Sequence, residues 1–267
     1  MRAVVAVLAC AAAVMGLDKI WVFGEAAGDD VASITLEMLA AARDLADTVE
    51  VFMAGDGDDY AEELGEHGAE TVYSTGDLDG ALQGVAVAAA VANAIEDGDV
   101  DAPDAFLLGT TQDGRDVAGR LSVKLDTPVI TNVVALEADG DHLVGSEPVF
   151  GGTVDVKTKN TSGKSGIFLV RPKSFEAEGV GGAEADTEDL DVPDLGAAGA
   201  AKVTNSHVEE SDGPKLDEAA IVVAGGRGLV LLDCRLPLLR VERRRKENRL
   251  FAQPVLDATR RHGSAGK

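Results

Sequence analysis

The sequence predicts a three-layer α/β protein built on a parallel sheet, and two patterns carry this prediction. Short apolar runs alternate with stretches of helical periodicity, as in chains that cross from one parallel strand to the next. The runs are continuous rather than alternating apolar and polar, which is typical of strands covered on both faces. The chain has 267 residues, of which 45% are hydrophobic. That is enough for a large core, or for one domain and the start of another.

The elements follow one another in a regular order. The first strand is expected at Lys19–Phe23, an apolar run that a glycine ends. Apolar residues then recur with helical spacing from Ile34 to Leu45, and Ser33 is the expected N-cap of that helix. The alternation continues with strands at 49–54, 71–74, 105–109 and 129–136, and helices at 60–66, 78–95 and 115–125.

Beyond Asp139 the pattern changes to strand-like runs separated by turns, which favours an antiparallel extension of a Rossmann-like domain at 17–175. Residues 176–213 are rich in Gly, Ala, Asp and Glu, and we interpret them as an acidic interdomain linker with one strand at 202–209. Residues 214–229 contain an apolar strand that enters a glycine loop, so a second, doubly wound α/β domain is expected to begin there. The runs of the extension are 142–149, 152–159 and 167–171.

The composition excludes several classes of function. The chain holds 24 Lys and Arg against 47 Asp and Glu, a net charge of −23, which disfavours nucleic-acid binding. Two Cys and four scattered His exclude a disulfide framework and a dense zinc site. Such acidity is typical of a halophilic protein in a high-salt cytoplasm, where salt screens the repulsion between carboxylates. The alternative is an ordinary acidic protein.

The two ends of the chain differ in composition from residues 17–229. Residues 1–16 hold an apolar run that is either the core of a signal peptide or a spurious extension before a true start at Met15. The run is too short to span a bilayer, and we expect no membrane insertion. Residues 230–267 hold ten basic and four acidic residues, and their basic cluster lies at Arg243–Lys246.

Two glycine-containing loops are candidate ligand sites. Gly226, Arg227 and Gly228 follow a strand, so backbone N–H groups and a guanidinium would face an anion there; a tight turn is the alternative. The loop Gly114–Asp116 follows the strand at 105–109, at the sheet edge where ligands bind in α/β proteins. The alternative for this loop is structural: Asp113 or Asp116 caps the helix and Arg115 pairs with a carboxylate.

The remaining motifs give weaker evidence for a functional site. The sequence Gly163-Lys164-Ser165 lacks the first glycine of a phosphate-binding loop, and no long helix follows it, so a turn is expected. No Ser/His/Asp or Cys/His set is recognisable, and the carboxylates are too dense for one pair to stand out as an acid–base couple. The sequence therefore predicts no catalytic residue and no metal ligand.

Taken together, a series of blocks resembles the α subunit of electron transfer flavoproteins, from about Leu17 to Leu229. The most specific blocks are GRD at 114–116, VRPKSF at 170–175 and GGRGL at 225–229, in this order. The acidic body resembles a version from a salt-loving archaeon. The full set of blocks is KIWVFGE, SITLEMLAAARDLA, FLLGTTQDGRDVAGRLSVKL, TNVVALE, PVFGGTVDVKT, FLVRPKSF and LDEAAIVVAGGRGL.

The resemblance implies an electron carrier rather than an enzyme with its own substrate. Such an α subunit forms a heterodimer with a β subunit and holds FAD in its C-terminal domain. It takes electrons from acyl-CoA and other dehydrogenases, as in fatty acid β-oxidation, and passes them through a quinone oxidoreductase to the respiratory chain. By the family match, Arg227, with Gly226 and Gly228, would lie against the FAD. The loop with Arg115 corresponds to the place where the sister β subunit holds AMP, and no nucleotide is expected there in an α subunit.

The resemblance stops after Leu229, where the family continues with the segments that supply most FAD contacts. A frameshift near Leu229 accounts for the change, and a real C-terminal variant is the alternative. We therefore expect 230–267 to be a non-native or disordered tail, and the truncated FAD site to bind FAD weakly or not at all. Two other functions stay open: an AMP-binding module that uses the 114–116 loop, and a non-redox scaffold that binds the β subunit.

Overall fold

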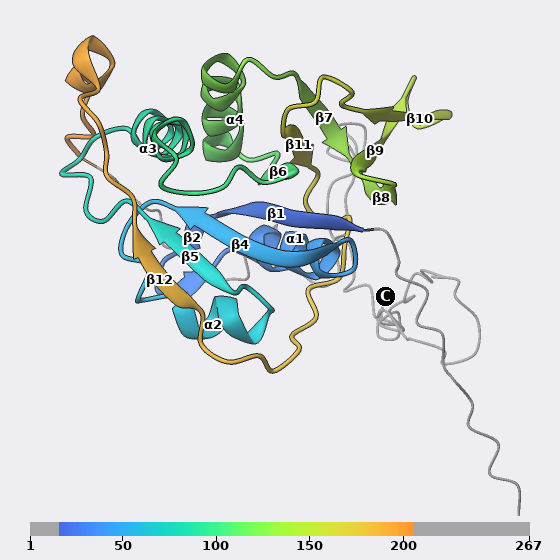
Figure 1. Cartoon of the computed structure of the whole chain (residues 1–267), viewed down its shortest axis with the longest axis horizontal. Coiled ribbons are helices and arrows are strands. Elements are labelled where there is room, and N and C mark those ends of the chain that lie inside the picture. The colour runs from blue at the N-terminus through green and yellow to red at the C-terminus, as the bar shows by residue number, and fades with distance from the viewer. Residues whose placement is uncertain (1–15, 206–267) are drawn as a thin grey trace, which may run out of the picture. The chain divides into compact units, whose positions relative to one another are not determined.

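The computed structural model describes residues 16–205 (Figure 1). Predictions for residues 1–15, for the glycine loop at 225–229 and for the basic tail at 230–267 lie outside the described residues. Within 16–205, every helix is too short or too polar to span a bilayer.

The core of the described part is a seven-stranded sheet in which every neighbouring pair is parallel. The strand order is β12-β5-β4-β1-β6-β11-β7. This confirms the predicted α/β class with its parallel sheet. The strands are β1 (Leu17–Gly24), β4 (Ala46–Met53), β5 (Thr71–Ser74), β6 (Ala105–Gly109), β7 (Val129–Val133), β11 (Gly166–Val170) and β12 (Asp186–Asp189).

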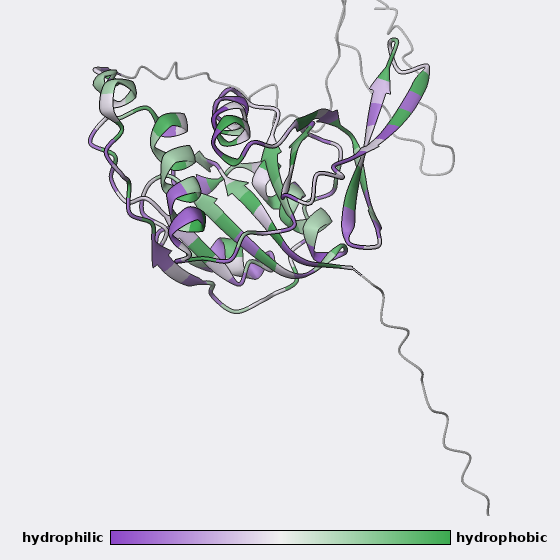
Figure 2. Cartoon of the chain, turned by 45° about the horizontal axis from the view of Figure 1, so that its top comes forward, coloured by the Kyte–Doolittle hydropathy of each residue, from purple (hydrophilic) through white to green (hydrophobic). Residues whose placement is uncertain are grey.

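Helices cover both faces of the sheet, as the continuous apolar strands require. α1 (Ser33–Arg43) and α2 (Ala61–Glu66) pack on one face, in a core with Ile20 and Val22 of β1. α3 (Gln83–Asp97) and α4 (Gln112–Leu125) pack on the other, in a core with Trp21 and Phe23 of the same strand (Figure 1). Successive residues of β1 thus serve opposite layers, and all four are fully buried. Figure 2 shows the central strands coloured as mainly hydrophobic.

The predicted antiparallel extension is present, but its composition differs. A three-stranded sheet of order β10-β9-β8 consists of β8 (Ala135–Asp139), β9 (His142–Val149) and β10 (Val154–Lys159). The expected single strand at 129–136 is wrong, because the chain leaves the main sheet after Val133 and β8 joins the small sheet. Asn132 has a φ of +57° at this departure.

The assignment of 167–171 to the extension is also wrong. β11 lies inside the main sheet, parallel to β6 on one side and β7 on the other. All five of its residues are buried, which is what an apolar run between two parallel neighbours requires. Apolar and polar residues do not alternate along β11, which agrees with a strand that is buried on both faces.

Residues 176–205, the described part of the predicted linker, contain a strand of the main sheet. β12 pairs in parallel with β5 at the edge of the main sheet, and Lys202 forms an isolated bridge with Ala81. A short 3₁₀ helix, Gly196–Ala200, lies between β12 and Lys202 in the sequence. No strand was expected at Asp186–Asp189, so β12 corrects the element assignment. Residues 206–209 of the strand expected at 202–209 lie outside the described residues.

Helix starts and caps also differ from expectation. α1 has Ala32 at its N-cap with no side-chain hydrogen bond, and Ser33 is its first residue, so the predicted Ser33 cap is wrong. The Ser33 hydroxyl instead accepts a hydrogen bond from Lys173. α3 begins at Gln83 rather than at 78. α4 begins at Gln112 rather than at 115.

One small hairpin completes the fold. β2 (Ala26–Ala27) and β3 (Asp30–Val31) form a two-stranded hairpin directly after β1. The hairpin returns the chain to α1, and the Ala32 N–H donates to the Glu25 carbonyl at 2.8 Å. Glu25 is therefore held between β1 and this hairpin.

Candidate functional site

The predicted flavin loop, Gly226, Arg227 and Gly228, lies outside the described residues and stays a prediction. The second predicted loop, Gly114–Asp116, is described. It lies in the first turn of α4, at the carboxyl ends of the strands. We therefore build the site from this edge of the sheet.

The strand order reverses between β1 and β6. From β1 the chain goes through α1 to β4 and then β5 on one side, whereas β6 opens the other half of the sheet. The helices after β1 and β6 lie on opposite faces of the sheet (Figure 1), so the carboxyl ends of these two strands form the switch point of the sheet, which we call the crevice. Such a reversal is where open α/β sheets bind their ligands.

Two side chains, 86 residues apart in the sequence, meet in this crevice. Glu25 follows β1, Thr111 follows β6, and the Thr111 hydroxyl donates to Glu25 Oε1 at 2.7 Å. The same hydroxyl accepts from the Gly114 N–H at 2.9 Å, so Thr111 is the N-cap of α4. The alternative in which Asp113 or Asp116 caps the helix is therefore wrong.

The backbone on both sides fixes this contact. The Glu25 N–H donates to the Thr35 hydroxyl of α1 at 3.0 Å, and the Thr110 N–H donates to the Val170 carbonyl at 2.8 Å. A Cβ on Gly109 would lie 3.0 Å from Glu25 Oε1, so the glycine leaves room for the carboxylate. The crevice is thus filled by a side chain whose backbone is anchored to α1.

Glu25 is 9% exposed, and its carboxyl group has an altered acidity. Burial raises the pKa of Glu25 above its ordinary value, and the negative charge of Asp113 adds to the rise. The hydrogen bond from Thr111 lowers the pKa and opposes part of this effect. The crevice therefore holds an acid whose charged form lacks full solvation.

This gives a prediction for stability. A carboxyl group with a raised pKa in the folded state binds its proton more tightly there than in the unfolded chain, so its contribution to stability falls as the pH rises through that pKa. Glu25→Gln keeps an oxygen that can accept from Thr111 but cannot ionise. We expect the melting temperature of this variant to gain on the wild type as the pH rises from about 5 to about 8.

Thermal melts at a series of pH values, in the same salt, test this. The buried Glu37, whose carboxylate pairs with Lys173 at 3.5 Å, provides the control Glu37→Gln. This control changes the net charge equally and should show no such gain. A constant difference between Glu25→Gln and wild type across the pH range would contradict the expectation.

The rest of the predicted loop is solvent-facing. Asp116 pairs with Arg120 at 2.9 Å, one turn along α4. Arg115 is exposed and makes no ion pair with any residue of 16–205, so the expected pairing of Arg115 with a carboxylate is not seen there. Sequence reasoning did not single out Glu25 or Thr111, although Glu25 directly follows the buried strand β1 and Thr111 stands two residues after the buried strand β6.

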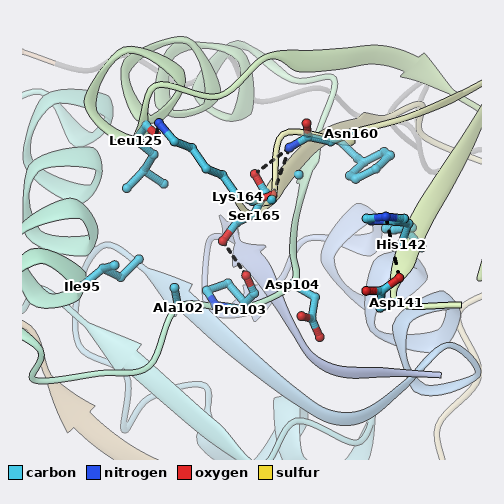
Figure 3. Close-up of a pocket in the computed structure, with 14 residues that line it drawn as sticks. Ile95, Ala102, Pro103, Asp104, Leu125, Asp141, His142, Asn160, Lys164 and Ser165 are labelled. Atoms are coloured by element: carbon cyan, nitrogen blue, oxygen red, sulfur yellow. Dashed lines mark hydrogen bonds and ion pairs between the residues drawn. The ribbon is translucent and has the colours of Figure 1, made fainter. Parts of the chain in front are cut away.

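A cavity of about 460 Å³ lies at the opposite edge, at the amino ends of β6 and β11 (Figure 3). Several of its polar groups are engaged with one another: Ser165 donates to the Pro103 carbonyl, and Asn160 donates to the Lys164 carbonyl at 3.0 Å. The Lys164 ammonium donates to the Leu125 and Asp126 carbonyls at the end of α4. This network joins the loops around the cavity. Lys164, the one lysine in the lining, already donates its hydrogen bonds to these carbonyls.

A second cavity, of about 450 Å³, lies beside the ends of β5 and β12. Its lining includes Asp77, Asp79, Asp189 and Asp191, together with Thr75. The Thr75 hydroxyl is buried and has no hydrogen-bond partner in the described part of the chain. The four carboxylates would repel the diphosphate of a dinucleotide. Neither described cavity therefore fits FAD.

Residues 16–205 also contain no group of three or more His, Cys, Asp or Glu side chains placed to hold a metal ion. We derive no metal chemistry from this part of the chain.

The β9–β10 hairpin carries three exposed apolar residues at and near its tip. Phe150 is 84% exposed, Val154 is 49% exposed and Val156 is 42% exposed. We call these three residues the hairpin patch. Figure 2 shows hydrophobic and hydrophilic residues interleaved along this hairpin.

The two faces of the hairpin differ. Lys157 and Lys159 of β10 pair with Glu137 and Asp139 of β8 at 2.7 and 2.6 Å, and these pairs form a charged face. Because side chains alternate along a strand, Val154 and Val156 lie on the other face. That face is continuous with the packed part of the small sheet.

The continuity is seen at Gly145 of β9, which pairs with Thr158, on the same face as Val156. A Cβ on Gly145 would lie 3.0 Å from Val133 and 3.2 Å from Phe168, so the small sheet packs closely on the main body there. The face is therefore covered at Gly145 and exposed at Val154 and Val156.

Comparison with known proteins agrees with this architecture. The model of the electron transfer flavoprotein domain matches residues 20–195. Protein FixB of Clostridium saccharobutylicum is 27% identical over 216 residues, 79% of this chain and 64% of its own length. The electron transfer flavoprotein subunit alpha of Syntrophomonas wolfei is 29% identical over 212 residues, 78% of this chain and 65% of its own length.

The subunit alpha of Bacillus subtilis is 26% identical over 226 residues, 79% of this chain and 65% of its own length. The chain thus spans slightly less than two thirds of the length of these relatives. The family match covers the seven-stranded sheet from β1 to β12 and both helical layers. The chain belongs to the electron transfer flavoprotein domain family.

Proposed function

We propose that this chain serves as the α subunit of an electron transfer flavoprotein. The observation that carries the proposal is the family match over residues 20–195, together with relatives that are named as α subunits. On this proposal the chain is an electron carrier that works with a β subunit. Acyl-CoA and other dehydrogenases would supply electrons, and a quinone oxidoreductase would accept them. A cytoplasmic, high-salt setting agrees with the net charge of −23.

We further propose that the hairpin patch docks the β subunit. Val154 and Val156 lie on the face of the small sheet that packs on the main body at Gly145, Glu147 shares this face as the partner of Val156, and Phe150 lies in the turn that follows β9. An exposed aromatic side chain flanked by valines is the composition of an interface centre, where aromatic residues contribute most to affinity. The charged face of the hairpin, with its Lys–carboxylate pairs, would then remain in solvent.

For the cofactor, we propose that Gly226, Arg227 and Gly228 lie against FAD and that the chain holds FAD weakly. Neither of the two cavities described above offers a free cation to the diphosphate of the cofactor, so we place its site at other residues. The loop at 225–229 supplies one guanidinium and several backbone N–H groups. The change to a basic composition after Leu229, where the family's flavin segments would follow, is the reason to expect weak binding.

Co-expression of the full chain with an electron transfer flavoprotein β subunit tests this proposal with two separate readouts. Complex formation is scored by gel filtration, and flavin is scored by its absorbance per complex. We expect a complex with less than stoichiometric flavin. Lack of a complex would contradict the α-subunit assignment, and stoichiometric flavin through gel filtration would contradict weak FAD binding.

Two matched variants locate the docking surface. Phe150→Asp changes a side chain that is 84% exposed, and Val123→Asp changes one on α4 that is 81% exposed. Because both are exposed, neither should alter folding. We expect Phe150→Asp to weaken the complex by about 2 kcal/mol, roughly thirty-fold in Kd, and Val123→Asp to leave it unchanged. Equal affinity of the two variants would rule out the hairpin patch as the docking surface.

A further inference from the structure

The cavity at the amino ends of β6 and β11 has an apolar side and a polar side. Figure 3 shows Ile95, Ala102 and Leu125 on one side of it, and Asp104, Asp141 and His142 on the other. Its volume of about 460 Å³ lies in the range of sites that bind small organic molecules. Such sites combine an apolar surface with a few polar groups that fix the orientation of the ligand.

The apolar side lies where the two helices of one layer end. Ile95 belongs to the last turn of α3, Leu125 is the last residue of α4, and Ala102 lies in the loop before β6. Ile95 and Leu125 are only partly buried against the core beneath them. An apolar group in the cavity would remove more of their surface from water, which favours binding.

The polar side has acceptor capacity that the chain itself does not use. Asp104 Oδ2 accepts from the backbone N–H groups of Asp18 and Lys19 at 2.8 and 3.0 Å, which fixes the carboxylate. Asp104 Oδ1 accepts no hydrogen bond from any residue of 16–205. The His142 ring lies 3.6 Å from Asp141 and makes no hydrogen bond within the same range. A hydrogen-bond donor that entered the cavity would therefore find a fixed oxygen without a partner.

The charges around the cavity select the kind of donor. The Lys164 ammonium pairs with the Asp126 carboxylate at 2.9 Å, so it does not neutralise the polar side. Asp104 and Asp141 give that side a negative charge, which attracts a cation at short range and repels an anion. A charged donor also forms a stronger hydrogen bond to a carboxylate than a neutral one does.

We propose that this cavity binds a small primary amine with an apolar body. The ammonium group has three N–H donors, and one of them donates to Asp104 Oδ1. The apolar body lies against Ile95 and Leu125. The cavity is at the opposite edge of the sheet from the 114–116 loop, and this inference does not depend on the proposed function.

Isothermal titration calorimetry of the full chain tests this with three probes. Phenethylamine, 2-phenylethanol and 3-phenylpropionate share a phenylethyl body and differ in the head group, which is an ammonium, a hydroxyl or a carboxylate. About 1 M salt shortens the Debye length to about 3 Å, which suppresses unspecific attraction of amines to a chain with a net charge of −23. We expect one phenethylamine to bind per chain, at least about tenfold more tightly than either other probe.

Two variants with matched controls locate the site. Asp104→Asn removes the charge but keeps an oxygen for the backbone N–H groups of β1, and Asp116→Asn removes a charge of α4 outside the lining. Ala102→Phe adds a ring at an exposed position of the lining, and Ala27→Phe adds one at an exposed position of the β2–β3 hairpin. We expect Asp104→Asn and Ala102→Phe each to weaken phenethylamine binding at least about tenfold, and the two controls to leave it unchanged.

Circular dichroism melts establish that each variant is folded. If Asp104→Asn is not, Asp141→Asn tests the charge instead, because the Asp141 side chain is 90% exposed, and it should also weaken binding. The absence of saturable phenethylamine binding by the wild type would overturn the proposal. Equal affinity for the three probes would do so too, as would a folded Asp104→Asn or Ala102→Phe that binds phenethylamine as tightly as the wild type.

Discussion

Gly114→Ala is expected to destabilise the protein by about 3 kcal/mol, whereas Gly119→Ala in the same helix is expected to stabilise it by about 1 kcal/mol. A Cβ on Gly114 would lie 2.2 Å from the Gly109 carbonyl oxygen, a backbone atom that cannot turn aside. A Cβ on Gly119 would have no heavy atom within 4 Å beyond its own helix and neighbours. The second substitution therefore only gains helix propensity.

The loss at Gly114 has a direct structural cause. Its N–H donates to the Thr111 hydroxyl, and Thr111 donates to Glu25, so a displaced first turn would break both bonds. Urea unfolding followed by circular dichroism measures both variants against the wild type. A loss at Gly114 no larger than that at Gly84→Ala would contradict the argument. At Gly84 the three nearest atoms to a new Cβ all belong to the side chain of Asp116, whose exposed carboxylate can rotate at the cost of its pair with Arg120.

The sequence predicted the central layers well, because their signals are local. β1, β5 and β6 are apolar runs bounded by glycine or polar residues, and α1 has apolar residues on one stripe. These patterns are set by burial on both faces or on one face, so they can be read without knowing the partner strands. The family resemblance added the family, and the match over residues 20–195 confirms it.

The place of β11 and the existence of β12 depend on long-range pairing. An apolar run of five residues has the same local pattern in an edge extension and between two parallel strands, and only its pairing with β6 and β7 decides. β12 has the sequence DTED and is fully exposed, so only its backbone hydrogen bonds to β5 define it as a strand. No side-chain pattern marks such an edge strand.

Of the residues at the crevice, the sequence predicted the 114–116 loop but not Glu25. The 114–116 loop was placed correctly at the carboxyl edge, because the preceding strand and the following helix were both clear. Glu25 was missed because one carboxylate among 47 acidic residues has no distinguishing local feature. Its role appears only when the strand order brings β1 beside β6 and Thr111 within hydrogen-bond distance.

The second large effect is expected at Trp21, on the opposite face of β1 from α1. Its side chain is fully buried, and its ring lies 4.8 Å from that of Tyr73, 5.8 Å from that of Phe106 and 6.0 Å from that of Phe52. Its indole N–H donates to the buried carboxylate of Glu50. Trp21→Ala removes the central ring of this cluster, and the expected loss is about 4 kcal/mol.

A matched variant separates packing from hydrogen bonding. Trp21→Phe keeps a ring in the cluster but leaves Glu50 without its indole donor, with Lys19 as its remaining partner at 3.1 Å. We expect a loss of about 2 kcal/mol, since a buried charged acceptor loses one hydrogen bond. Both variants remove the only Trp, so unfolding has to be followed by circular dichroism rather than by fluorescence.

Comparison of the two losses decides which interaction holds β1 in the sheet. Since Trp21 lies on β1 and Glu25 directly follows this strand, a loosened β1 would also weaken the contact between Glu25 and Thr111. We therefore expect Trp21→Ala to lower the protection of the backbone amides of β1 from hydrogen exchange, and Trp21→Phe to lower it less. Equal losses of stability in the two variants would mean that the hydrogen bond to Glu50, and not ring packing, provides most of the stabilisation.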